Sequence, residues 1–137
     1  MRITTRGRYA LRASIALARF FDLKSPISIS QLSEEEHISS IFLEQIFFKL
    51  RKAEIVSSIR GPGGGFQFTR APNKITLKEI LDSAGEELDV TACDKNAKAC
   101  NITGKRCSSH SVWKDITKIL DDYLSKTTLT MVMEREI

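Results

Sequence analysis

The feature that most constrains this chain is a glycine-rich turn between two short β-prone segments. Residues 55–60 and 66–69 are rich in β-branched and aromatic side chains, and four glycines and one proline separate them. This pattern predicts a β-hairpin with a tight, exposed tip. A helical pattern over residues 39–52 comes directly before it and ends in Lys49, Arg51 and Lys52. A helix followed by a basic hairpin is typical of a winged helix-turn-helix, in which the helix enters the DNA major groove and the hairpin lies beside it.

The length and composition favour one soluble domain with an appended helix. The chain has 137 residues, 42% of them hydrophobic, and no run approaches the roughly eighteen apolar residues of a membrane span. Arg12 and Arg19 interrupt the apolar run over residues 9–23, so the run does not resemble a signal-peptide core. We therefore expect a cytoplasmic protein with no membrane span.

The basic excess lies in the N-terminal half. Residues 1–70 hold 11 Lys or Arg against 6 Asp or Glu, a net charge of +5, while residues 71–137 hold 10 against 11, a net charge of −1. Four arginines, Arg2, Arg6, Arg8 and Arg12, open the chain before an amphipathic helical pattern. These arginines are either the solvated end of a core helix or phosphate contacts, and we favour phosphate contacts because they lie in the basic half.

Two serines predict the ends of a helix-turn-helix. Ser28 and Gln31 form a capping box at the start of a short helix that runs to about Glu36. Residues 37–39 then form a turn in which Ser39 can cap the second helix, with Ile41 or Phe42 facing inward together with Ile46 and Leu50.

The opposite face of the second helix predicts DNA contacts. Gln45 can bond adenine, Glu44 can accept from cytosine, and Lys49 can reach phosphate or guanine; Glu44 can equally reject wrong sites or face solvent. We expect Gly61, Gly63, Gly64 and Gly65 to need positive φ, with Arg60 entering a minor groove. The candidate DNA-binding residues are Arg2, Arg8, Ser39, Ser40, Glu44, Gln45, Lys49, Arg60, Gly61, Gly63 and Gly64.

A cysteine segment follows a further helix over residues 76–85. Between residues 90 and 111 the helical periodicity disappears, and Cys93, Cys100, Cys107 and His110 form the pattern C-x6-C-x6-C-x2-H. An odd number of cysteines in a cytoplasmic chain argues against structural disulfides. From chemistry alone an iron–sulphur cluster, a zinc ion and a bare thiol switch all remain open. An enzyme with a nucleophilic cysteine lacks a second base, since His110 is the sole candidate near the segment.

The last helical pattern predicts a dimer. Apolar residues recur at three- and four-residue steps from Val112 to Leu124, opposite Asp115, Lys118, Asp121 and Asp122. We expect this stripe to pack against a second copy, which would create a homodimer that reads a two-fold DNA site. A helix folded back onto its own domain is the alternative.

The chain resembles the iron–sulphur cluster-dependent winged-helix transcription regulators of the IscR/NsrR type, and it is most similar to the IscR branch. The resemblance covers essentially the whole chain. It rests on residues 1–4, 7–10, 43–45, 50–52 and 56–65, and on the three cysteines with His110 and Trp113. Arg8 matches the IscR branch, whereas the nitric-oxide branch has an aspartate ligand there. The cysteine gaps are one residue longer than the five usual in the family, and Ile41 replaces a DNA-contacting serine.

The resemblance implies the function and the cofactor. It implies a homodimeric, DNA-binding regulator that is not an enzyme, acts as a repressor of iron–sulphur or redox and stress genes, and has no small-molecule substrate. Its metal ligands would be Cys93, Cys100, Cys107 and His110, holding a 2Fe-2S cluster. The alternative function is a zinc-stabilised or thiol-switch interaction module of the same fold.

The predicted fold class is mainly α with a small β-hairpin wing, a winged helix-turn-helix with a long C-terminal dimerisation helix. We divide the chain into a DNA-binding domain over residues 1–85, a cluster-binding loop over residues 86–110, and a dimerisation helix with its tail over residues 111–137.

Overall fold

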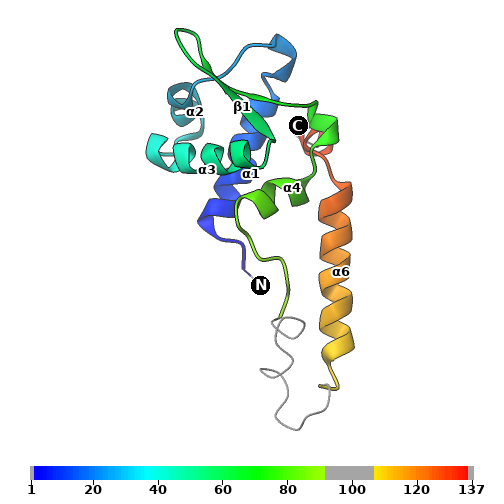
Figure 1. Cartoon of the computed structure of the whole chain (residues 1–137). Coiled ribbons are helices and arrows are strands. Elements are labelled where there is room, and N and C mark those ends of the chain that lie inside the picture. The colour runs from blue at the N-terminus through cyan, green and yellow to red at the C-terminus, as the bar shows by residue number, and fades with distance from the viewer. Residues whose placement is uncertain (1, 92–106, 136–137) are drawn as a thin grey trace.

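The computed structural model describes residues 2–91 and 107–135. A helical body carries a hairpin on its surface, and the long helix α6 (His110–Lys126) extends away from the body beyond α4 (Leu77–Ser83) (Figure 1). This arrangement confirms the predicted fold class. The elements are α1 (Thr5–Ala18), η1 (Phe21–Leu23), α2 (Ile29–Glu36), α3 (Ser40–Lys52), β1 (Val56–Ile59), β2 (Gly65–Phe68), η2 (Pro72–Lys74), α4 (Leu77–Ser83), α6 (His110–Lys126) and α7 (Leu129–Glu134).

The two predicted serine caps define the helix-turn-helix. The Ser28 hydroxyl accepts a 3.1 Å hydrogen bond from the Gln31 N–H at the start of α2, and the Ser39 hydroxyl accepts one of 3.1 Å from Phe42 at the start of α3. His37 ends α2 in the left-handed conformation, with φ of 55°. The chain therefore turns between the two helices within three residues.

The core forms around α1, which packs against α2, α3, α4 and α7. Leu43, Ile46, Phe47 and Leu50 of α3 are all buried. Of the two residues expected to face inward at the start of α3, Phe42 is the inward one: it packs edge-on against Tyr9 at 5.4 Å between ring centroids. Ile41 points outward and is 71% exposed.

The wing is a two-stranded antiparallel hairpin in which Val56 pairs with Phe68 and Ile59 with Gly65. Positive φ occurs at Gly61, Gly63 and Gly65, as expected. The same expectation was wrong for Gly64, whose φ is not positive. An added Cβ at Gly64 would overlap the Ile59 carbonyl and lie 2.8 Å from the Gly61 carbonyl, so glycine is required there by a close approach of backbone.

A capping box begins α4. The Thr76 hydroxyl accepts from the Glu79 N–H at 3.2 Å, and the Glu79 carboxylate accepts from the Thr76 N–H at 2.8 Å. Burial works against the charged form of this carboxylate. The bond from the Thr76 backbone and the nearby Arg70 guanidinium outweigh that effect, so the pKa of Glu79 is lowered.

The C-terminal part contains two helices rather than one helix and a tail. Helix α6 begins at His110, two residues before the expected start, and α7 follows it. Backbone hydrogen bonds fix this junction to the body. The Leu77 N–H donates to the Thr127 carbonyl at 2.9 Å, and the Leu129 N–H donates to the Ile75 carbonyl at 3.0 Å. Because Leu129 is fully buried, α7 anchors one end of α6 to the core. No helix within residues 2–91 and 107–135 is long and apolar enough to span a membrane.

Candidate nucleic-acid interface and cysteine segment

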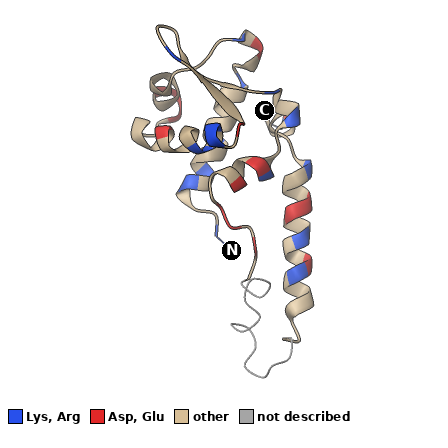
Figure 2. Cartoon of the chain, viewed as in Figure 1, with Lys and Arg blue, Asp and Glu red and all other residues tan. Residues whose placement is uncertain are grey.

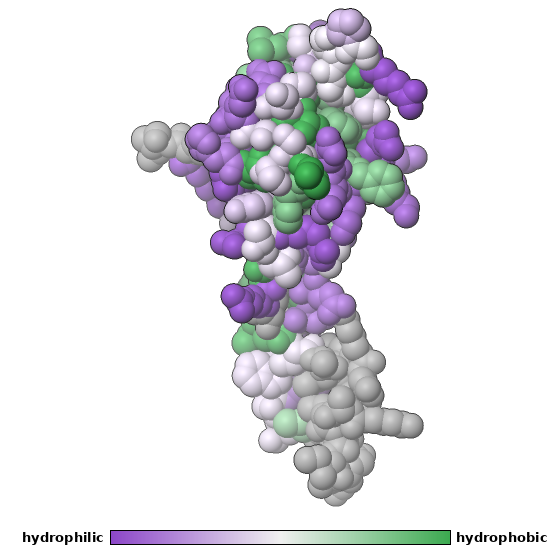
Figure 3. All heavy atoms as spheres, turned by 90° about the vertical axis from the view of Figure 1, so that its left-hand side faces the viewer, coloured by the Kyte–Doolittle hydropathy of each residue, from purple (hydrophilic) through white to green (hydrophobic). Residues whose placement is uncertain are grey.

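The outer face of α3 presents a mixed polar and apolar surface. Ser39, Ser40, Glu44 and Gln45 are exposed, as the sequence predicted, whereas Lys49 is half-buried. Ile41 and Phe48 are exposed large apolar side chains on the same helix, with exposed fractions of 71% and 56%. The side of the molecule that carries α2 and α3 shows apolar atoms surrounded by hydrophilic ones (Figure 3). Such a surface can make both hydrogen bonds and methyl contacts with base edges.

Arg51, which was not among the candidate residues, connects α3 to the wing. Its Nη1 donates a 3.4 Å hydrogen bond to the Ser58 hydroxyl of β1, and its guanidinium lies 5.9 Å from the Phe48 ring centroid. Both partners are exposed, so the guanidinium remains on the surface beside the recognition helix. The basic residues at the end of the helical pattern, Lys49, Arg51 and Lys52, were the sequence signal that could have identified Arg51.

The wing carries the expected exposed residues. Arg60, Gly61 and Gly63 are exposed at its tip, and Gly64 is half-buried. Basic residues lie along α3, at the start of α1 and on the hairpin (Figure 2). Acidic residues lie on α4 and the segment after it, at the end of α2, and together with lysines on α6. The basic residues of the candidate interface therefore lie on a surface that also has acidic neighbours on α2.

The N-terminal arm, residues 2–8, brings two predicted arginines together. Arg2 and Arg8 are exposed and line one surface hollow of about 590 Å³ with Ile3, Thr4 and Thr5. Arg8 Nη2 donates to the Thr5 hydroxyl at 3.2 Å. A hollow bordered by two guanidinium groups is suited to an anion such as a phosphate.

Glu86 holds this arm, and sequence reasoning missed it. Its Oε1 accepts from the Thr4 hydroxyl, from the Thr4 N–H at 3.2 Å and from the Gly7 N–H at 3.0 Å. Glu86 is only 8% exposed although it is charged. An added Cβ at Gly7 would overlap Oε1 and lie 2.6 Å from Cδ. A glycine among the arginines directly before the predicted helical pattern was the signal that could have revealed this contact.

Lys49 extends toward the same region. A Cβ added at Gly85 would lie 3.3 Å from Arg6 Nη2 and 3.9 Å from Lys49 Nζ. Gly85 follows α4 with φ of 86°, so both cations lie at the C-terminal end of that helix. The partial negative charge of a helix C-terminus stabilises cations there.

Two of the four predicted metal ligands, Cys107 and His110, lie within the described residues, at the start of α6. Cys107 is exposed, and its carbonyl accepts a 3.0 Å hydrogen bond from the N–H of His110, the first residue of α6. The Cys107 Sγ lies 3.1 Å from the Ser109 hydroxyl, which also accepts from the Trp113 indole N–H at 3.1 Å. Cys93 and Cys100 lie outside the described residues. Within the described ranges no group of three or more metal-binding side chains occurs.

The donor chemistry of this turn fits an iron–sulphur cluster. A thiol and an imidazole three residues apart lie on one turn at the end of a helix, and the two remaining thiols belong to the segment directly before it. Thiolate and imidazole are the protein ligands that such clusters use. The described residues therefore fit the predicted ligand set at Cys107 and His110.

Helix α6 contacts α4, its Leu124 packs against the core, and much of its surface is exposed. Trp113, Leu120 and Leu124 are partly buried. The apolar side chains on the exposed face, which we call the α6 face, are Val112, Ile116, Ile119 and Tyr123, with exposures of 50%, 37%, 66% and 48%.

Polar contacts fix α6 at two places. Lys78 of α4 pairs with Asp121 of α6, and this hydrogen bond, with the nearby Asp82, raises the pKa of Lys78. Arg135 donates a 2.9 Å hydrogen bond to the Tyr123 hydroxyl, which lowers the pKa of Tyr123. The exposed stripe is thus held in a defined orientation.

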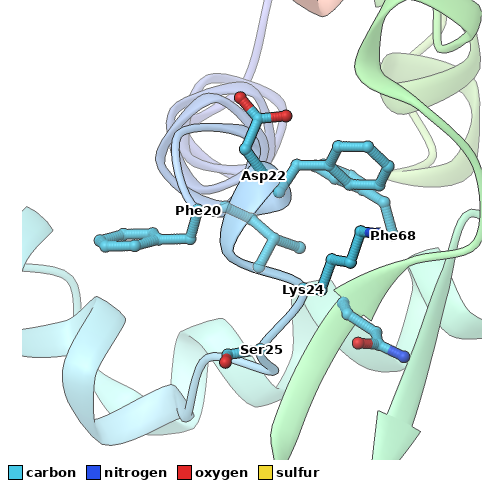
Figure 4. A pocket seen from close by; sticks show the side chains of 8 residues that line it. Phe20, Asp22, Lys24, Ser25 and Phe68 are labelled. Atoms are coloured by element: carbon cyan, nitrogen blue, oxygen red, sulfur yellow. The ribbon is translucent and has the colours of Figure 1, made fainter.

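A separate hollow of about 360 Å³ lies between the η1 turn and β2 (Figure 4). Phe20 and Phe68 contribute its aromatic walls, while Asp22, Lys24 and Ser25 come from an exposed turn. None of the candidate DNA-binding or metal-binding residues lines it. The candidate interface therefore lies elsewhere, on α3, the wing and the N-terminal arm.

Comparisons with known proteins identify the family of the chain. Residues 3–135 match the Rrf2 family, described as an iron-dependent transcriptional regulator. A putative HTH-type transcriptional regulator, ORF2 of Azotobacter vinelandii, is 38% identical over 135 residues, which cover 98% of this chain and 80% of the relative. The HTH-type transcriptional regulator IscR of Vibrio cholerae is 36% identical over 138 residues, covering 100% of this chain and 78% of IscR.

Solved structures match over nearly the whole chain. IscR of T. potens superposes with a TM-score of 0.79 at 27% identity, covering 98% of this chain and 87% of that one. CymR, the global cysteine regulator of B. subtilis, gives a TM-score of 0.85 at 26% identity, covering 100% and 99%. The chain therefore belongs to the Rrf2 family, and it is a DNA-binding transcription regulator of the Rrf2 and IscR type rather than an enzyme.

Proposed function

We propose that this chain is a cytoplasmic, homodimeric repressor whose DNA binding responds to a 2Fe-2S cluster, and that its targets are iron–sulphur or redox and stress genes. The observation that supports the proposal is the turn at the start of α6, in which the His110 N–H donates a 3.0 Å hydrogen bond to the Cys107 carbonyl. The similarity to proteins named IscR supports the same cofactor.

DNA recognition would use three elements on one protomer. Helix α3 enters the major groove with Ser40, Glu44 and Gln45, and the wing places Arg60 against the neighbouring minor groove. Arg2 and Arg8 contact phosphate from the N-terminal arm. Ile41 is exposed on the first turn of α3, where its side chain fits the methyl group of a thymine.

The α6 face would be covered by the same face of a second copy. Its four apolar side chains are exposed from Val112 to Tyr123, a stripe of about 18 Å along the helix. A stripe of this kind buries itself by pairing with an identical helix. Two-fold pairing would place two α3 helices for a two-fold DNA site.

Cys93, Cys100, Cys107 and His110 would hold the cluster. When bound, an iron–sulphur cluster supplies an oxidation-sensitive link between protein ligands that are otherwise separate along the chain. Residues 107–110 lead directly into α6, and α6 carries the face of the dimer. Thiolates are required as ligands, and the basic residues Lys95, Lys98, Lys105 and Arg106 favour their ionised form.

The decisive experiment is the visible spectrum of anaerobically purified protein together with its iron and sulphide content. We expect two irons and two sulphides per chain, and their loss in Cys100→Ala. His110→Ala should retain a cluster of shorter lifetime, because a neutral imidazole binds iron more weakly than an anionic thiolate. A colourless protein with one zinc per chain would instead support the zinc-stabilised alternative. An unaltered spectrum and lifetime in His110→Ala would remove His110 from the ligand set.

A further inference from the structure

We propose that Glu86 is a positioning residue for DNA binding, which fixes the N-terminal arm so that Arg2 and Arg8 can contact phosphate. This inference rests on the proposed function, in which those arginines are phosphate contacts. It adds that a buried carboxylate 78 positions beyond Arg8 determines whether that contact can form.

The geometry is that of a helix cap supplied from a distant part of the chain. Oε1 of Glu86 accepts from Thr4 and Gly7, so it bonds the N-cap residue and the first turn of α1 at the same time. The N–H groups of a first helical turn have no partners within the helix, and a carboxylate there also gains from the helix dipole. The bonds therefore fix both the direction of α1 and the chain entering it.

Gly7 makes this approach possible. Any side chain at position 7 would occupy the space of the carboxylate, since even a Cβ would overlap Oε1. The residues on either side, Arg6 and Arg8, are exposed and basic. Glu86 is thus buried beside the arm, while the arginines on either side of Gly7 remain exposed.

The segment that carries Glu86 connects the arm to the cysteine segment. We call residues 85–91 the strap; they leave α4 and end next to the residues that include Cys93. Figure 1 shows the strap passing beside the N-terminus. Farther along, the Val90 N–H donates to the Thr117 hydroxyl of α6 at 3.2 Å. Arm, strap and α6 therefore form one continuous set of contacts.

The test is a double-mutant cycle between Glu86→Ala and Arg8→Ala in the full chain. Affinity and its salt dependence are measured on a duplex obtained by in vitro selection with the parent protein. Arg8→Ala in the parent should weaken binding about tenfold and lower the salt slope by about one. Glu86→Ala should have a similar effect without removing any basic side chain. The double variant should be no more than about twofold weaker than either single variant, because the same contact is lost in all three.

Glu86→Gln distinguishes positioning from loss of structure. Glutamine retains an oxygen where Oε1 accepts its bonds, so this variant should recover most of the affinity lost in Glu86→Ala. Hydrogen exchange of the free protein provides an independent readout. In Glu86→Ala, protection should decrease at the amides of residues 4–8 while those of α3 stay protected.

Three outcomes decide whether Glu86 positions the arm for DNA binding. If Arg8→Ala weakens binding equally in the parent and in Glu86→Ala, and exchange at residues 4–8 is unaltered, Glu86 does not position the arm. If Arg8→Ala has no effect in the parent, the proposed phosphate contact is wrong, and the exchange measurement alone decides whether Glu86 holds the arm. If both the cycle and the exchange behave as described, the inference stands whether or not the protein contains a cluster.

Discussion

Replacing Gly7 with alanine sets two opposing effects against each other. Gly7 lies in the first turns of α1 with helical backbone, so helix propensity alone predicts that alanine stabilises the protein by up to about 1 kcal/mol. The Glu86 carboxylate, however, occupies the space of the new methyl group. It must move away and lose the bonds from Gly7 and Thr4.

The structure indicates which effect is larger. Hydrogen bonds to a charged group contribute about 1.5–3 kcal/mol, and a carboxylate that is 8% exposed pays a further desolvation cost when its partners are lost. Subtracting the propensity gain leaves a net loss of about 1–3 kcal/mol in the free energy of unfolding of Gly7→Ala. Urea denaturation followed by circular dichroism measures this difference, provided that the slopes of the two transitions agree.

The matched control is Gly7→Ala in a Glu86→Ala background. Without the carboxylate there is nothing for the methyl group to displace, so the same substitution should now stabilise the protein by up to about 1 kcal/mol. The predicted reversal of sign is the critical result. If Gly7→Ala stabilises both backgrounds equally, the contact between Gly7 and Glu86 contributes nothing to stability and the reasoning fails.

Three further predictions concern the wing, the α6 face and pH. Arg60→Ala should weaken DNA binding by roughly 1–3 kcal/mol with a lower salt slope; an unchanged affinity in titrations at several salt concentrations would contradict the assigned role. Ile119→Glu, at the most exposed position of the α6 face, should give a folded monomer by sedimentation, and a persistent dimer would place the interface elsewhere. Because the folded-state pKa of Glu79 is lowered, its stabilising effect is present above its unfolded value of about 4.5 and is lost as the pH falls through the folded pKa. Acid titration of Glu79→Gln should therefore show a shallower loss of stability below pH 4.5 than the parent, and parallel curves would show that the capping box has no such effect.

Elements with local signals could be predicted from the sequence. The caps at Ser28 and Ser39, the turn of the hairpin and the helix after Thr76 each depend on residues within four positions of one another. Interactions between residues so near in sequence can be predicted without knowledge of the fold. The exposed residues of α3 followed from helical spacing in the same way.

Features that depend on distant partners were not predictable. Helix α7 has only six residues, and its position is set by backbone bonds between Leu77 and Thr127 and between Ile75 and Leu129. The Glu86 contacts connect residues 79 and 82 positions apart. The sequence also could not show why each glycine of the wing is required. Gly63 has a positive φ that favours glycine, whereas at Gly64 the neighbouring backbone is too close for any side chain.

The pairing of Ile27 with Phe66 has a consequence for solubility. A protruding hairpin has two open edges, and unpaired edges recruit strands from other molecules. Here the outer edge of β2 is occupied, because Phe66 and Ile27 exchange hydrogen bonds of 2.8 and 2.9 Å. The remaining edge, β1, is only four residues long, has Ser57 and Ser58 at its centre, and is followed by Arg60 and Pro62. The wing can therefore extend from the protein toward its ligand without acting as a template for aggregation.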